Sequence, residues 1–127
     1  MGKINRRWLL TSGVVLIAAA IWFAVREYRC TVRGSIFAQQ VETIKQDAAK
    51  ELRIGTDKTG VAKFFTSHGM SFSTWGPEAY GGLHTLGCAP PIACGTDIAF
   101  ITVRVKLDAN GAVAEAPNVT GMYKDCV

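Results

Sequence analysis

The residues of this chain with the most telling chemistry are its four cysteines: Cys30, Cys88, Cys94 and Cys126. An even number of cysteines in an oxidising compartment favours disulfides. Five residues separate Cys88 from Cys94, and two of them are proline, so this stiff loop can bring its own ends together. We therefore predict two disulfides, Cys88–Cys94 and Cys30–Cys126, although four cysteines allow three connectivities.

A metal site is the rival interpretation of the same residues. His84, Cys88, Cys94 and Cys126 could supply four soft ligands. However, the chain lacks the closely spaced cysteine pair of structural zinc sites, and thiolates outside the cytoplasm tend to oxidise. A redox-active Cys-x-x-Cys pair is absent as well. We therefore expect neither a metal nor any other cofactor.

The two histidines offer little catalytic chemistry. His68 falls in the last turn of a predicted helix, where a cation is favoured without any catalytic role. We expect His84 on the surface of a strand, and the chain has neither a Gly-x-Ser-x-Gly motif nor a phosphate-binding loop. The protein is thus not expected to be an enzyme. The alternative is a small enzyme or ligand-binding domain that uses His84 and a glycine-rich loop at 76–87.

These residues all follow one hydrophobic run, Trp8 to Val25, which contains no charged side chain. As a helix, it would rise about 27 Å at ~1.5 Å per residue, close to the ~30 Å bilayer core. Lys3, Arg6 and Arg7 precede it, which favours a cytoplasmic N-terminus. The run predicts a signal anchor, and hence a single-pass inner-membrane protein with its C-terminal domain in the periplasm.

Two other interpretations of the run are weaker. A cleaved signal peptide usually has a shorter apolar region that ends in small residues, whereas this run ends in bulky ones, and Ala18-Ala19-Ala20 lies in its middle. A lipoprotein would need small apolar residues before Cys30, where Glu27, Tyr28 and Arg29 stand. The anchor remains our prediction.

The net charge of +4 is concentrated around the run. Residues 1–29 carry five basic side chains and one acidic side chain, whereas residues 30–127 carry nine of each. The excess can hold the anchor against anionic lipid head groups. The rest of the chain has no basic stripe for phosphates, so we exclude nucleic acid as a partner.

Beyond the run, the pattern predicts four regions: a cytoplasmic N-terminus at 1–7, the anchor at 8–25, a linker at 26–34 and one domain at 35–127. Gly34 is expected to stop the preceding helix, and Ser35 to cap a new one. Apolar residues then recur with helical spacing. They are Phe37, Val41, Ile44, Ala48 and Leu52. A shorter helix is expected at 57–68, capped by Thr56 and stopped by Gly69.

After Gly69 the apolar period changes to two, which predicts strands at 70–74, 80–86 and, most clearly, 98–107. Asp108 to Gly111 is typical of a hairpin turn, and 112–116 is expected to return as a strand. Helices followed by strands predict an α+β fold, with two helices packed on a three- to four-stranded antiparallel meander.

A segment near the middle of the chain resembles part of a known family. Arg53-Ile54-Gly55-Thr56, followed by Val61, Phe64, Phe65 and Gly69-Met70-Ser71-Phe72, is similar to outer-membrane-assembly lipoproteins of the BamE/OmlA type. The resemblance implies two helices against a three-stranded sheet and no functional residues. The chain departs from this family by having a membrane helix where the family has a lipid-modified cysteine.

The overall pattern also resembles pilins, with a basic leader, a membrane helix, an amphipathic helix, a sheet and a late cysteine. The glycine before a Phe-Thr-x-x-Glu start, which prepilins have, is missing from this chain.

These observations together predict a non-catalytic, membrane-anchored module that binds another envelope or secreted protein. An immunity protein against a periplasmic toxin fits this description, and so does a subunit of an envelope or secretion complex.

Overall fold

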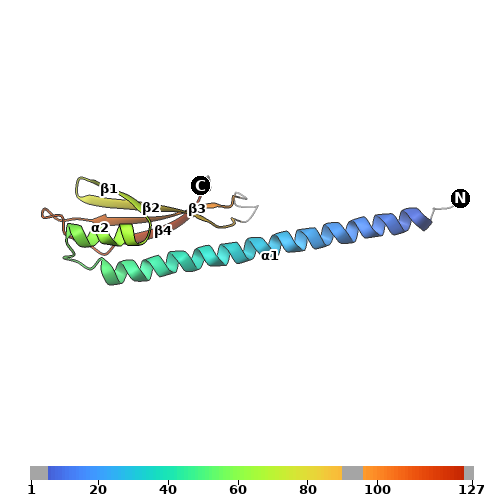
Figure 1. Ribbon diagram of the computed structural model, residues 1–127, viewed down its shortest axis with the longest axis horizontal. Coiled ribbons are helices and arrows are strands. Elements are labelled where there is room, and N and C mark those ends of the chain that lie inside the picture. The colour runs from blue at the N-terminus through green and yellow to red at the C-terminus, as the bar shows by residue number, and fades with distance from the viewer. Residues whose placement is uncertain (1–5, 90–95, 125–127) are drawn as a thin grey trace.

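The computed structural model describes residues 6–89 and 96–124 and has an α+β fold (Figure 1). Two helices precede a four-stranded antiparallel sheet, whose strands pair in the order in which they follow one another in the chain. The elements are α1 (Arg6–Glu51), α2 (Lys58–Ser67), β1 (Ser71–Trp75), β2 (Glu78–Leu86), β3 (Ile98–Lys106) and β4 (Asn118–Tyr123). The α+β prediction is therefore confirmed.

Helix α1 is unbroken over 46 residues, which gives it a length of about 69 Å. The expected linker at 26–34 is wrong, because this segment is helical throughout. Gly34 does not stop the helix, and the Ser35 hydroxyl donates to the carbonyl oxygen of Val32 within it. A single glycine costs a helix only about 1 kcal/mol. Packing of the helix on the sheet from Phe37 onward offsets this cost.

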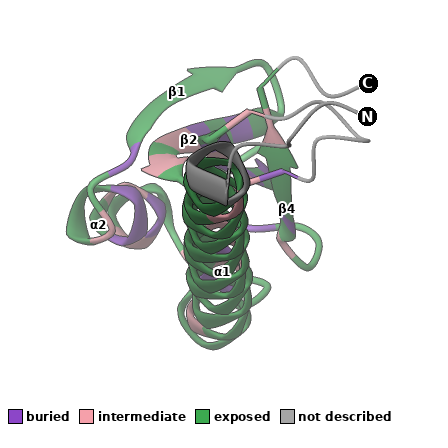
Figure 2. Ribbon diagram, turned by 90° about the vertical axis from the view of Figure 1, so that its right-hand side faces the viewer, coloured by how far each residue is buried: buried purple, intermediate pink, exposed green. Residues whose placement is uncertain are grey.

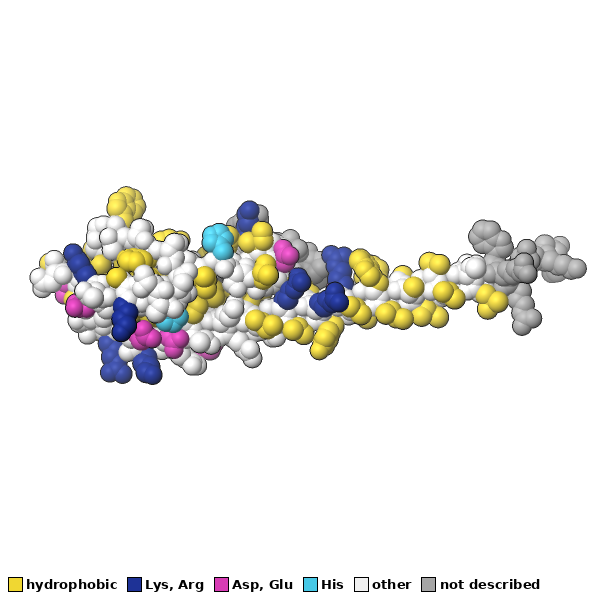
Figure 3. All heavy atoms as spheres, in the orientation of Figure 1, with side chains coloured by type: hydrophobic (Ala, Val, Ile, Leu, Met, Phe, Trp, Pro, Cys, Tyr) yellow, Lys and Arg dark blue, Asp and Glu magenta, His cyan; other side chains and the backbone are white. Residues whose placement is uncertain are grey.

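The C-terminal half of α1 carries the predicted apolar face, and this face packs on the sheet. Phe37, Ile44, Ala48 and Leu52 are buried, and Val41 packs against the same core. The helix packs closely on β4 at Gly121, where a Cβ atom would press against Val41. The N-terminal half of α1 extends beyond the domain, and its large apolar side chains from Leu10 to Val25 are exposed (Figures 1 and 3).

Helix α2 begins one residue later than expected and is capped by Asp57, not Thr56. The Asp57 carboxylate accepts a hydrogen bond of 2.8 Å from the backbone N–H of Gly60. The predicted stop at Gly69 is confirmed, because this residue has a φ of 66° and the next N–H, of Met70, donates back to the carbonyl oxygen of Phe65.

The sheet buries only one of its faces. Strand β3 alternates as predicted, with Ile101, Val103 and Val105 fully buried and Arg104 and Lys106 exposed. Helices α1 and α2 lie side by side under this buried face (Figure 2). Phe65 of α2 fits against Gly81 of β2, where a Cβ atom would overlap its ring. The opposite face of the sheet therefore has no helix over it.

The strand expected at 112–116 is wrong. Asp108 makes the predicted turn, since its carboxylate accepts from the N–H groups of Asn110 and Ala112. After the turn, however, the chain forms only one isolated bridge, between Val113 and Leu107, the residue after β3. The backbone of Val113 bonds instead to Gly55 and Thr56 in the loop between the helices. The pairing strand β4 begins later, beyond Pro117.

Candidate functional site

The uncovered face of the sheet is the most distinctive surface of the domain. Side chains of alternate residues on all four strands point to it, because each strand exposes every second residue on this side. Large apolar residues are prominent there. The most exposed are Trp75, at 90%, Leu86, at 64%, Met122, at 52%, and Tyr80, at 46%. Exposed apolar residues that gather on one face of a small domain are typical of a binding surface.

A shallow hollow of about 440 Å³ lies in the middle of this face. His84 meets Phe100 edge to face, with ring centroids 4.5 Å apart. Beside the hollow, the guanidinium of Arg104 lies 5.7 Å from the ring centroid of Tyr80. The hollow is lined by Ser71, Phe72, Ser73, Tyr80, Gly82, Leu83, His84, Phe100, Thr102 and Met122. None of these described residues is a carboxylate, a lysine or a cysteine that could work with His84.

The glycine-rich segment 76–87, expected to form a loop around His84, is mostly strand. Gly76 forms the turn after β1, with a φ of 58°, and β2 begins two residues later. His84 is exposed on β2, as predicted for it. A loop that could close over a substrate is therefore not present in this segment.

Strand β1 forms one edge of the sheet, and its outer side has no pairing strand in the described part of the chain. All five of its residues, Ser71–Trp75, are exposed, and none is charged or proline. Most exposed edge strands carry a lysine, a proline or a bulge, which prevents pairing with other chains. The sequence reasoning missed this feature. The signal that could have found it is a charge-free segment placed first in the meander.

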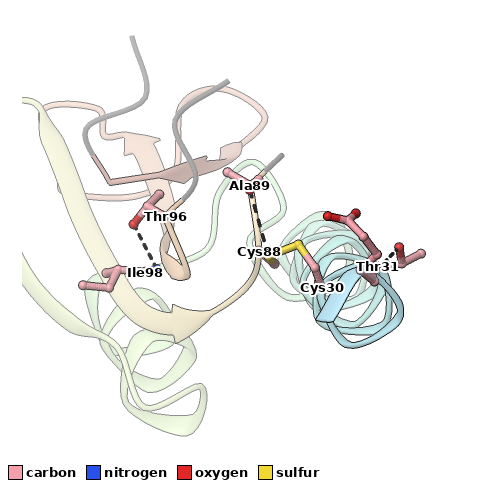
Figure 4. The surroundings of a disulfide bond; sticks show 7 residues. Cys30, Thr31, Cys88, Ala89, Thr96 and Ile98 are labelled. Atoms are coloured by element: carbon pink, nitrogen blue, oxygen red, sulfur yellow. Dashed lines mark hydrogen bonds between the residues drawn. A yellow bond between two sulfur atoms is a disulfide. The ribbon is translucent and has the colours of Figure 1, made fainter. Parts of the chain in front are cut away.

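The disulfide of the described residues joins Cys30 of α1 to Cys88, just after β2 (Figure 4). Their Cα atoms lie 5.1 Å apart, and 58 positions separate them in the sequence. Both predicted pairs are therefore wrong, since each used one of these two cysteines. Cys94 and Cys126 lie outside the described residues. Because Cys88 is bonded to Cys30, it is also unavailable as the metal ligand that was considered with His84.

The other histidine, His68, fastens α2 to α1. Its Nε2 lies 3.1 Å from a carboxylate oxygen of Asp47, and its Nδ1 lies 2.9 Å from the carbonyl oxygen of Phe64. Burial of the ring lowers the pKa of His68. The hydrogen bonds to Asp47 and Phe64 and the negative charges of Glu51 and Asp47 outweigh this effect, so the pKa of His68 is raised. Both ring nitrogens face acceptors, which suits the protonated form.

This contact makes the stability of the domain depend on pH. Because the folded pKa of His68 exceeds the unfolded value of about 6.5, its contribution is fully present below that pH. It is lost as the pH rises through the folded pKa. We expect His68→Gln to lower the free energy of unfolding more at pH 5.5 than at pH 8.5, measured by urea titration of a fragment that begins at Arg26. Asp47→Asn should reproduce this pattern, and equal losses at the two pH values would contradict it.

No protein-family model, curated protein or solved structure matches this chain. The resemblances to BamE/OmlA-type lipoproteins and to pilins therefore stay predictions. Among the described residues, α1 is the one helix long and apolar enough to be a membrane span or a signal anchor. The most apolar part of that helix has no buried residues in the fold.

Proposed function

We propose that this chain is a membrane-anchored, non-catalytic module of the bacterial envelope that binds another protein through the β1 edge of its sheet. The apolar half of α1 is the anchor in the inner membrane, with the N-terminus in the cytoplasm and the domain in the periplasm. The basic residues before the run support this orientation. The Cys30–Cys88 disulfide supports the oxidising compartment.

The observation that carries the binding proposal is the uncharged edge strand β1, every residue of which is exposed. Its free backbone N–H and C=O groups can pair with an extended segment of a partner, which would become a fifth strand. Trp75 is then available as an anchor residue at the rim, at 90% exposure. Hollows flank β1 on both sides: the one beside His84, and a second of about 350 Å³ between α2 and the Gly76 turn. Both hollows can accept alternate side chains of the added strand.

The direction of the strands favours a partner other than a second copy. The strands run broadly lengthwise along α1 (Figure 1). Two β1 edges that paired antiparallel would be related by a two-fold axis perpendicular to the strands. Their α1 helices would then point in opposite directions, so the two helices could not cross one membrane with the same orientation. Both specific roles proposed for this chain, an immunity protein and a subunit of an envelope or secretion complex, involve a partner other than a second copy.

The alternative, a small enzyme or ligand-binding domain that uses His84, has less support. His84 is exposed, its closest aromatic neighbour is Phe100, and the hollow around it is open. A general acid or base acts best in a water-excluding pocket beside a second polar group. The surface described here suits protein contact better.

Photo-crosslinking of the full-length protein in its native membranes tests the proposal. With the crosslinker at Thr74 on β1, we expect one discrete adduct with another envelope protein. The further change Trp75→Ser should reduce the adduct at least tenfold, because loss of an aromatic anchor costs about 2 kcal/mol of binding. Because Trp75 is exposed, this change should leave the fold intact.

Ile54→Ser is the matched control, since Ile54 is 72% exposed in the loop between the helices and away from β1. Its adduct should equal that of the parent. Equal adduct yields for Trp75→Ser and Ile54→Ser, or an adduct with a second copy of this chain, would contradict the proposal.

A further inference from the structure

A third hollow lies where α1 leaves the domain. The Cys30–Cys88 disulfide forms part of its lining, and it has a volume of about 520 Å³. It is lined by Trp22, Val25, Arg26, Glu27, Arg29, Cys30, Arg33, Cys88, Ala89 and Asp97. Figure 3 shows Lys and Arg side chains gathered at this point of the molecule. We call this hollow the arginine notch.

Three arginines of α1 share one helical face within the notch. Arg26, Arg29 and Arg33 are spaced by three and four residues, so at about 100° per residue they fall within an arc of roughly 60°. Cys30 lies on the same side and is bonded to the domain. The three exposed arginine side chains therefore line the same side of the hollow between helix and domain.

Within 6–89 and 96–124, none of the three guanidinium groups has a carboxylate partner. The ion pairs of the described residues are His68–Asp47 and Lys106–Glu115, although Glu27 and Asp97 also line the notch. Arg26 lies over the ring of Trp22, with its guanidinium carbon 5.6 Å from the centroid. Guanidinium groups bind phosphate oxygens through two parallel hydrogen bonds, and here their donors remain available.

The height of the notch matches the head-group layer, if the proposed anchor is correct. The apolar run ends at Val25, and Arg26 follows directly. Each head-group layer is about 5–8 Å thick, and Arg29 lies only ~5 Å farther along the helix than Arg26. Arg33 is ~10 Å beyond Arg26, and its long side chain can reach back toward the layer. The exposed ring of Trp22 would lie just inside the same boundary.

We propose that the arginine notch binds the phosphate group of an anionic phospholipid in the outer leaflet of the membrane. This inference rests on the proposed anchor but is independent of the β1 edge. Its occupant is anionic because the three arginines outnumber the two carboxylates of the lining. A lipid is favoured over a free anion because the notch opens beside the apolar run, where acyl chains lie.

Fluorescence quenching by brominated lipids tests the proposal in the full-length protein. Trp8→Phe and Trp75→Phe leave Trp22 as the reporter beside Arg26. In phosphatidylcholine nanodiscs, we expect brominated phosphatidylglycerol to quench Trp22 at least twofold more than the same mole fraction of brominated phosphatidylcholine. Replacing Arg26, Arg29 and Arg33 together by Gln should bring this ratio to one. Replacing Lys45, Lys50 and Arg53 together by Gln removes equal charge at the far end of α1 and should leave the ratio unchanged.

The outcomes distinguish failure of the proposed lipid site from failure of the proposed membrane anchor. Quenching by both lipids without preference would overturn the site and leave the anchor intact, as would a preference that survives the three arginine changes. Absence of quenching by either lipid, with release of the protein by carbonate washing, would overturn the anchor and the site together. Loss of the preference in inorganic phosphate, but not in chloride of equal ionic strength, would show that a free anion occupies the notch and would overturn the lipid assignment.

Discussion

Val105→Asp is expected to unfold the domain at a urea concentration at which Lys106→Asp leaves it folded. The Val105 side chain is fully buried between the sheet and its helices, beside Ala79 of β2. A carboxylate there would have no partner, and burying it costs several kcal/mol. This loss is comparable with the total stability of a small domain, about 5–15 kcal/mol.

Lys106 is the neighbouring control because its side chain is on the solvent side of the same strand. Its Nζ lies 2.9 Å from a carboxylate oxygen of Glu115, and both side chains are more than half exposed. Loss of such a pair changes stability by about 1 kcal/mol or less. Urea midpoints of the fragment that begins at Arg26, which keeps Cys30, decide the comparison. If the two variants unfold at the same midpoint, the register of β3 is wrong.

The second large effect is expected when Cys30 and Cys88 are both replaced by serine. The disulfide closes a loop of 58 positions, and a cross-link of this span stabilises a fold by roughly 4 kcal/mol in the chain-entropy model. We therefore expect a markedly lower urea midpoint for the double variant.

Peptide mapping without reduction checks the pairing itself. Trypsin releases Cys30 in the peptide 30–33 and both Cys88 and Cys94 in the peptide 64–104, so fragmentation of the linked pair between residues 88 and 94 must show which cysteine carries the link. We expect these two peptides to be linked. A link between 30–33 and the C-terminal peptide 125–127 would instead restore the Cys30–Cys126 pair and overturn Cys30–Cys88.

The features that could be predicted from the sequence are those in which one periodic pattern decides the structure. The alternation along β3 marked Ile101, Val103 and Val105 as buried, and the structure buries all three. The three- and four-residue spacing from Phe37 to Leu52 likewise identified the face of α1 that packs on the sheet. In both cases burial of apolar area outweighs every local preference, so the pattern alone was sufficient.

The errors arose where a local signal competed with contacts between distant parts of the chain. Gly34 locally favours the end of a helix, yet the helix continues because its contacts with the domain, the Cys30–Cys88 bond on one side and the buried face from Phe37 on the other, stabilise it. Because the helix is continuous, Cys30 lies beside the end of β2 and bonds to Cys88. The short proline-containing segment between Cys88 and Cys94 does not indicate this contact. Residues 112–116 do not form the predicted strand, because the backbone of Val113 bonds to the loop between the helices.

The candidate binding surface could be predicted only in part. The exposed position of His84 followed from its place in the strand pattern, but the free edge of β1 depends on the order of strands in the sheet. The arginine notch depends on the unbroken helix and on the Cys30–Cys88 bond, neither of which the local patterns indicated.

The unbroken path of α1 from its apolar half into the core also affects the entropy of association. Two freely tumbling proteins lose translational and rotational freedom when they bind, at an estimated cost of about 4–15 kcal/mol. Once α1 is in a bilayer, as we propose, no flexible linker lets the domain tilt relative to its anchor. The domain then retains only lateral diffusion and rotation about the membrane normal. A partner held in the same membrane would therefore meet β1 at one height and one inclination, and much of the orientational search would already be complete before the two proteins touch.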